Sequence, residues 1–172
     1  MAATPEDLAA YLRDLGIETR TVTHPPLHTV EESQALRGEI AGAHTKNLFL
    51  KDKKDALFLV IAPEEADIDL KHLHRRIGAA SRLSFGRAEL LLETLGVLPG
   101  SVTAFGLIND RDGRVTAILE AGLLEASAVN CHPLTNTATT SLAPRDLLAF
   151  IRATGHEPQI LALDETAAAT RL

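Results

Sequence analysis

Gly42-Ala43-His44-Thr45-Lys46-Asn47-Leu48-Phe49-Leu50-Lys51 predicts a largely apolar strand that carries a lysine near its start. Successive side chains of a strand point to opposite faces, so Lys46 shares one face with Leu48 and Leu50 while Asn47 points to the other. A lysine on an apolar face needs an anionic partner, because a buried unpaired ammonium is costly. The alternative is an edge-strand lysine whose stem lies on apolar surface with its head in water. The segment therefore predicts either an anion-binding site or an ordinary strand edge.

A second apolar strand is predicted at 56–62, and the charged turn Lys51-Asp52-Lys53-Lys54-Asp55 joins it to the first. Another hairpin is predicted between strands at 102–109 and 114–120, through Asp110-Arg111-Asp112-Gly113. Strands outnumber helices and several neighbours are hairpin-linked, so we expect an α/β (α+β) fold with a mixed or antiparallel sheet. The other strands are expected at 18–23, 83–85, 129–132, 137–142 and 159–163, and the helices at 4–15, 29–38, 69–77, 88–95 and 144–154.

The composition is that of one globular domain. With 172 residues, of which 45% are hydrophobic, the chain can bury a substantial core, and we assign 1–163 to a single domain and 164–172 to a flexible tail. No apolar run approaches the length of a membrane span, and the first residues lack the pattern of an export signal. Cys131 is the only cysteine, which excludes an internal disulfide and favours a cytoplasmic location.

Charge is unevenly distributed along the chain. The formal net charge of −6 argues against a general nucleic-acid coat protein. The segment 70–88 nevertheless contains several lysines and arginines and no acid. It is either a solvated helix face or a local phosphate-binding patch formed by Lys71, Arg75, Arg76 and Arg82.

Four blocks of sequence together resemble the YbaK/ProX family of free-standing aminoacyl-tRNA editing deacylases. The first is His24-Pro25-Pro26 followed by Thr29-Val30-Glu31-Glu32, and the second is 42–52. The third runs from Leu95-Gly96-Val97-Leu98-Pro99-Gly100 to 110, and the fourth is Asn130-Cys131-His132-Pro133-Leu134-Thr135-Asn136-Thr137. The resemblance covers about 5–163, and its order and spacing are more specific than any single block. It is greatest to the ProX branch, which clears alanine from mischarged tRNA(Pro).

This resemblance implies a fold like the insertion domain of prolyl-tRNA synthetases, with a curved, mixed, mostly antiparallel and barrel-like sheet around a pocket. It also implies hydrolysis of an aminoacyl ester without a metal or organic cofactor. Lys46 matches the functional lysine of the family, Asn47 its neighbour, and His132 a pocket histidine. The loop 100–104 matches a glycine-rich loop near the scissile ester, but Ala104 stands where many relatives have proline.

Hydrolysis of this activated ester requires an anchor for the tRNA end, stabilisation of the carbonyl oxyanion and a positioned water. We expect Lys46 to pair with the terminal phosphate, and the 2′-hydroxyl of the substrate's own ribose to help activate the water. The candidate catalytic residues are Lys46, Asn47, Gly100, Ser101 and His132. The candidate substrate-binding residues are Thr29, Val30, Leu36, His44, Thr45, Val102, Thr103 and Ala104, and the candidate tRNA-binding residues are Lys46, Lys71, Arg75, Arg76 and Arg82.

Other chemistries find less support in the sequence. His72 and His74 are two apart on a predicted helix and point to different faces, so a shared metal is not expected. Ser101 lacks the nucleophile-elbow context of a serine hydrolase, and Cys131 suits a small buried residue better than a thiolate nucleophile. His132 can be a proton shuttle or a structural histidine before Pro133.

The function expected from these features is hydrolysis of Ala-tRNA(Pro) in trans, with Cys-tRNA(Pro) as the alternative substrate. A non-catalytic module that binds tRNA ends or a synthetase is a second possibility. A small-molecule esterase is a third, disfavoured because it would not need the basic segment 70–88. The expected partners are the acceptor end of tRNA(Pro) and, as a candidate, prolyl-tRNA synthetase, with no membrane or DNA partner.

Overall fold

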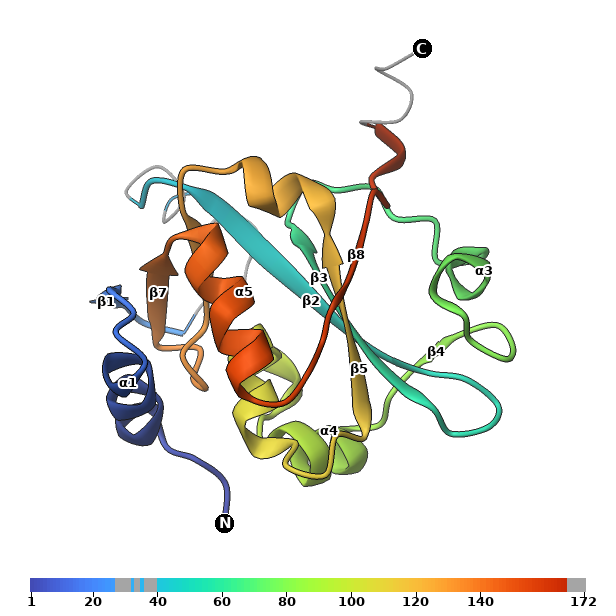
Figure 1. Cartoon of the computed structure of the whole chain (residues 1–172), viewed down its shortest axis with the longest axis horizontal. Helices are drawn as coiled ribbons and strands as arrows, with labels where there is room; N and C mark the ends of the chain where they lie inside the picture. Colours follow the sequence, from blue (N-terminus) through green and yellow to red (C-terminus); the bar gives the residue numbers. More distant parts are fainter. Residues whose placement is uncertain (27–31, 33–34, 36–39, 167–172) are drawn as a thin grey trace.

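A single mixed sheet organises the computed structural model, which describes residues 1–26, 32, 35 and 40–166 (Figure 1). Its strands follow the order β1-β7-β6-β2-β3-β5-β8, and the short β4 pairs with β2 outside this path. The strands are β1 (Arg20–Thr23), β2 (Ala43–Lys51), β3 (Leu57–Pro63), β4 (Ser84–Phe85), β5 (Val115–Glu120), β6 (Val129–Cys131), β7 (Ala138–Leu142) and β8 (Gln159–Leu161).

β2 is the longest strand and contacts three others. It pairs antiparallel with β3 and β4, and parallel with β6 at Ala43 and His44. The hairpin predicted from the charged turn is therefore confirmed, with Lys46 opposite Ala62. The pairs β1–β7 and β6–β7 are also antiparallel, whereas β3–β5 and β5–β8 are parallel. The expectation of a mixed, mostly antiparallel sheet is confirmed.

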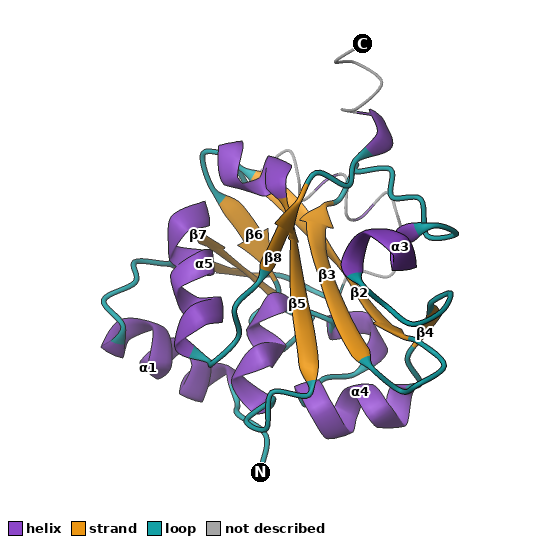
Figure 2. Cartoon of the chain, turned by 45° about the vertical axis from the view of Figure 1, so that its right-hand side comes forward, coloured by secondary structure: helices purple, strands orange, loops and turns teal. Residues whose placement is uncertain are grey.

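Helices cover both faces of this sheet (Figure 2). α1 (Pro5–Asp14), α4 (Ala88–Leu95) and α5 (Pro144–Ala153) pack on the larger core, to which β2 contributes Phe49. α3 (Leu73–Ile77) packs on a smaller cluster, to which β2 contributes Leu50. Because Phe49 and Leu50 are neighbours, the alternation predicted for this strand is confirmed.

The start of α1 follows directly from its sequence. Thr4 accepts a hydrogen bond from the backbone N–H of Asp7, and the Asp7 carboxylate accepts one from the Thr4 N–H. This capping box satisfies two donors that the first turn would otherwise leave unpaired. Pro5 follows at the first helical position, where its missing N–H costs nothing.

The strand predicted at 102–109 is wrong, and so is its hairpin with 114–120. Residues 104–109 form a 3₁₀ helix, η2 (Ala104–Asn109), which follows η1 (Pro99–Ser101). β5 pairs parallel with β3 and β8 instead. Ala104 to Leu107 are buried on every side, and a short apolar run of this kind does not reveal its period. A third 3₁₀ helix, η3 (Ala121–Glu125), follows β5.

The helix predicted at 69–77 is shorter, because Asp69 accepts hydrogen bonds from Lys71 N–H and the His72 ring and so forms a turn before α3. The predicted tail is tied down at its beginning, where Asp164 pairs with Ile68. The helix predicted at 29–38 lies almost wholly outside the described residues, as do 167–172.

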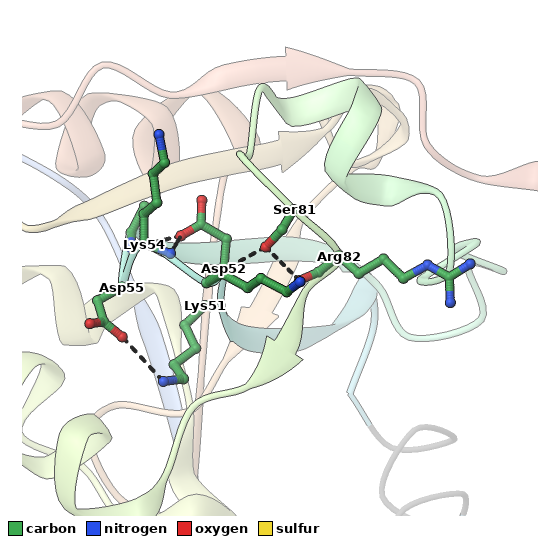
Figure 3. Close-up of polar contacts among 8 residues, drawn as sticks. Lys51, Asp52, Lys54, Asp55, Ser81 and Arg82 are labelled. Atoms are coloured by element: carbon green, nitrogen blue, oxygen red, sulfur yellow. Dashed lines mark hydrogen bonds and ion pairs between the residues drawn. The ribbon is translucent and has the colours of Figure 1, made fainter.

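The turn between β2 and β3 is organised by Asp52 (Figure 3). Its carboxylate is buried and accepts hydrogen bonds from the backbone N–H groups of Lys54, Ala56 and Ala80 at 2.9–3.0 Å. The bond to Ala80 joins the turn to the loop that follows α3. These donors, that of Ala80 first, hold the pKa of Asp52 below its usual value of 3.8.

Asp52→Asn should lower the thermal unfolding midpoint at pH 7, because an amide nitrogen cannot accept the hydrogen bonds that one carboxylate oxygen now receives. Folding depresses the pKa of Asp52. The stabilisation that its carboxylate contributes is therefore present above the unfolded-state pKa and disappears as pH falls through the folded-state pKa. The difference between wild type and variant should therefore shrink below about pH 4. Asp55→Asn in the same turn, which breaks only the exposed 3.2 Å ion pair with Lys51, is the control. Equal midpoints for wild type and Asp52→Asn at pH 7 would contradict this.

Candidate active site

Lys46 lies on the face of the sheet that carries the smaller apolar cluster. It shares this face with Leu48 and Leu50, and its side chain is half-buried. The Nζ atom donates a hydrogen bond to the carbonyl oxygen of Ala66, in the segment after β3. The ammonium is therefore held against the protein, and among the described residues its two other N–H donors have no partner and are open to a ligand.

His44 and Glu64 lie next to Lys46 on the same face. They are opposite each other at the open end of the β2–β3 hairpin, where Glu64 N–H donates to the His44 carbonyl at 2.8 Å. The Nε2 atom of His44 is buried and has no hydrogen-bond partner among the described residues. A buried ring nitrogen without a partner is unfavourable unless a ligand or water satisfies it. His44 is thus the side chain here most in need of a polar partner.

His132 reaches this group from the end of β6. Its Nδ1 lies 3.2 Å from the carbonyl oxygen of Ala138, so Nδ1 carries the proton and Nε2 has a free lone pair. Burial lowers the pKa of His132, with smaller effects from His24 and His44, which lower it, and from Glu64, which raises it. The ring is therefore neutral at pH 7 and can accept a proton.

His24 completes the cluster of histidines from the segment after β1. Its Nε2 lies 2.9 Å from the Thr139 hydroxyl, and its Nδ1 lies 2.9 Å from the carbonyl oxygen of Pro25. Both ring nitrogens are thus already in use. Within the described ranges, no group of histidine, cysteine or acidic side chains has the geometry to hold a metal ion.

Thr45 and Asn47 point to the opposite face from Lys46. The Thr45 hydroxyl donates to the Asn130 carbonyl at 2.7 Å and links β2 to β6. Asn47 Oδ1 is buried, with no hydrogen-bond partner in the part of the chain that the structure describes. Burial raises the pKa of the neighbouring Cys131 thiol to about 12, which keeps it unreactive. The structure thus separates Thr45 and Asn47 from the Lys46 side chain.

The glycine loop adjoins the His132 end of the sheet. A Cβ atom at Gly100 would lie 3.7 Å from the amide nitrogen of Asn136, in the connection that begins at His132. Ser101 N–H donates to the Leu98 carbonyl at 2.8 Å and closes η1. Gly100 is exposed and Ser101 half-exposed, so this part of the loop is accessible.

The rest of the loop is more deeply placed. Val102 is half-buried against the larger core, while Thr103 and Ala104 are completely buried. The Thr103 hydroxyl accepts the N–H of Phe105 and caps η2. Thr103 and Ala104 therefore support the loop from inside, and their side chains do not line an open surface.

The basic residues of 70–88 form two separate groups. Lys71, Arg75 and Arg76 are exposed on and before α3, and the two arginines border a pocket of about 160 Å³ next to the C-terminal segment. Arg76 donates to the carbonyl oxygen of Ala162 at 3.0 Å. The pocket also contains Asp69 and Glu165, so it is less basic than the sequence segment suggested.

Several predicted site residues are not tested by this geometry. Thr29, Val30 and Leu36 lie outside the described residues. Arg82 is exposed and follows Ser81, whose hydroxyl accepts a hydrogen bond from Lys53 N–H in the β2–β3 turn. Glu64 was missed at the sequence level, although the register of a hairpin with this turn places it opposite His44. No helix in the described ranges is long and apolar enough to cross a membrane.

Comparisons with known proteins agree with this architecture. A "Prolyl-tRNA synthetase associated domain-containing protein 1" of Danio rerio is 42% identical over 161 residues, covering 92% of this chain and 87% of the relative. The "Prolyl-tRNA editing protein ProX" of Acetoanaerobium sticklandii is 35% identical over 148 residues, covering 86% and 90%. A crystal structure of a candidate trans-editing enzyme for prolyl tRNA synthetase shares the fold, with a TM-score of 0.71, 22% identity and coverage of 96% and 99%. The family model for the aminoacyl-tRNA editing domain matches residues 24–150, and the chain belongs to this family.

Proposed function

We propose that this chain is a trans-acting deacylase that hydrolyses mischarged Ala-tRNA(Pro). The observation that carries the proposal is the placement of Lys46, His44 and His132 on one face of the sheet, in an aminoacyl-tRNA editing domain. A phosphate at the tRNA end needs a cation, and the reacting ester needs polar groups beside it. A small-molecule esterase would have no use for the cation.

The reaction proceeds by attack of water on the carbonyl carbon of the ester. The bond from that carbon to the ribose oxygen breaks, and the ribose leaves with a proton. Lys46 binds the terminal phosphate, and the neighbouring 2′-hydroxyl positions and activates the water. Nε2 of His132 accepts the proton and returns it to the leaving oxygen, while His44 Nε2 hydrogen-bonds the substrate.

Amino-acid selection follows from the limits of a single apolar pocket. One methylene discriminates by only about 1–3 kcal/mol, so a synthetase pocket shaped for proline also accepts the smaller alanine. A second pocket that is too small for proline removes this error. Thr29, Val30 and Leu36 are proposed to contribute to that pocket, with the loop at Gly100 on its other side.

Incubation with Ala-tRNA(Pro), Cys-tRNA(Pro) and Pro-tRNA(Pro) tests the proposal directly. We expect Ala-tRNA(Pro) to lose its amino acid at least about tenfold faster than either of the others. Faster hydrolysis of Cys-tRNA(Pro) would change the proposed substrate but leave the proposed reaction intact. Stability of all three esters would reject the deacylase and favour a binding module for tRNA or for prolyl-tRNA synthetase.

The pH dependence of deacylation should follow His132. Because burial lowers its pKa, kcat/KM should rise with pH through an inflection that lies below the usual histidine value of 6.5. His132→Gln should lower kcat/KM at least about tenfold at pH 7 and remove this inflection. His24→Gln is the control and should retain the inflection, since both ring nitrogens of His24 are already hydrogen-bonded. Identical profiles for wild type and His132→Gln between pH 5 and 8 would exclude the proton-transfer role.

A further inference from the structure

Phe85 is an exposed aromatic ring in a protein that buries its other phenylalanines. Phe49, Phe58, Phe105 and Phe150 are at most 5% exposed, whereas Phe85 is 62% exposed. Single exposed aliphatic residues are common and need no explanation. A large flat ring held in water is less usual, and its surroundings show what it can bind.

The backbone holds this ring in a defined place. β4 pairs with the end of β2, with Phe85 opposite Leu50. Gly86 N–H donates to the Phe49 carbonyl at 2.9 Å, and a Cβ atom at Gly86 would lie only 2.4 Å from the Phe49 ring. The missing side chain of Gly86 allows β4 to approach β2 this closely, and Phe85, the residue before it, points to the opposite face. The ring is thus presented on a rigid strand rather than on a free loop.

Phe85 lies on the same face of the sheet as Lys46. Cross-strand partners share a face, so Phe85 lies with Leu50, and Leu50 lies with Lys46 by alternation. Leu50 is four positions after Lys46, which places the ring about 13 Å along the strand from the proposed phosphate anchor.

Exposed cations lie on the segments that adjoin β4, namely the loop before it, the start of α4 after it and the β2–β3 turn. Lys53, Lys54, Arg82 and Arg87 are exposed, and none of them forms an ion pair with another described residue. The acids of the turn are already engaged, because Asp52 binds backbone N–H groups and Asp55 pairs with Lys51. Lys53 N–H also donates to the Ser81 hydroxyl at 2.8 Å and so links the turn to the loop that carries Arg82.

We propose that Phe85 is a stacking platform for an unpaired nucleobase in the single-stranded 3′ end of tRNA, with Arg82, Arg87 and the turn lysines on the flanking phosphates. Aromatic rings bind unpaired bases by stacking, and neighbouring cations hold the backbone. A lone ring among cations fits a polyanion that carries flat bases better than an apolar protein surface. The proposal rests on the proposed function, because it assumes that the occupant of the Lys46 site is a tRNA end.

The test measures binding of RNA hairpins that represent the acceptor stem and carry no amino acid. Phe85→Ala and Phe85→Leu should each weaken binding of a hairpin with a single-stranded 3′ end by about 5- to 100-fold, while Phe85→Trp should retain it. A blunt hairpin without the unpaired end should bind all four proteins equally. Leu92→Ala, which removes another exposed apolar side chain (52%) from α4, is the matched control and should bind as wild type does. Equal thermal midpoints establish that the variants are folded.

Three results would overturn the platform. They are undiminished binding by Phe85→Ala, full binding by Phe85→Leu, or an equal loss with the blunt hairpin. In the first of these cases, a loss of binding to prolyl-tRNA synthetase would identify Phe85 as a protein-docking residue instead. Because the RNA in these measurements carries no amino acid, the results are independent of catalysis. A chain that binds RNA through Phe85 but hydrolyses no aminoacyl-tRNA would reject the proposed function and leave the platform standing.

Discussion

Replacing Lys46 by alanine is expected to lower kcat/KM for Ala-tRNA(Pro) by about 100-fold. The variant loses the charge-assisted bond to the terminal phosphate, and the ester is then no longer held in register with the polar groups beside it. The change should not unfold the protein, because Lys46 is only half-buried and its described hydrogen bond is a single one to the Ala66 carbonyl. Single-turnover deacylation and thermal unfolding of the same preparation separate the two effects.

Lys51→Ala is the matched control for this substitution. Lys51 is on the same strand and carries the same charge, but it is an odd number of residues from Lys46 and so points to the other face. Its ammonium pairs with Asp55 at 3.2 Å on an exposed surface, where ion pairs contribute little. Lys51→Ala should therefore deacylate as wild type does. Equal losses in both variants would mean that general charge, and not the position of Lys46, controls the rate.

Removing the 2′-hydroxyl of the terminal ribose is expected to reduce turnover of Ala-tRNA(Pro) by at least about 100-fold. Among the described residues on the Lys46 face, no side chain has the surroundings of an activated nucleophile, and the Cys131 thiol has a pKa of about 12. The substrate hydroxyl would supply the missing group that positions and activates water. Binding should change far less than turnover, because the phosphate anchor is untouched.

Deacylation of the 2′-deoxy substrate can be measured under single-turnover conditions beside the unmodified tRNA. Competition by each uncharged tRNA gives its affinity independently of chemistry. An unchanged rate for the 2′-deoxy ester would exclude substrate assistance and move the task of activating water to His132, whose Nε2 is unprotonated at neutral pH. Combining the 2′-deoxy substrate with His132→Gln should raise the activation free energy by less than the sum of the two single changes if both groups act in one proton relay.

Local patterns were sufficient for much of the fold. The capping box at Thr4, the hairpin around Asp52 and the helix that Gly96 ends are all present as expected. The opposite orientation of Lys46 and Leu50 relative to Phe49 was also predictable, because alternation is a property of the strand itself. Each of these features depends on residues that are close in the chain.

Features that depend on distant residues were less predictable. The apolar run at 104–107 became a 3₁₀ helix, since complete burial removes the polar positions that would reveal a period. The parallel pairing of β5 with β3 and β8 has no local signal, because the paired strands are far apart in sequence. Asn47 adjoins Lys46 in the chain, yet the sheet separates their side chains.

The sequence by itself determined the family resemblance, the lysine-bearing strand and the face on which Lys46 lies, because those depend on residue order and on the two-residue period of a strand. Only the tertiary structure decided that His132 joins His44 and Glu64 beside that lysine, since β6 pairs with β2 across a long stretch of sequence. It alone also decided that Phe85 remains exposed on that face, because this required Gly86 to pack against Phe49 from a different strand.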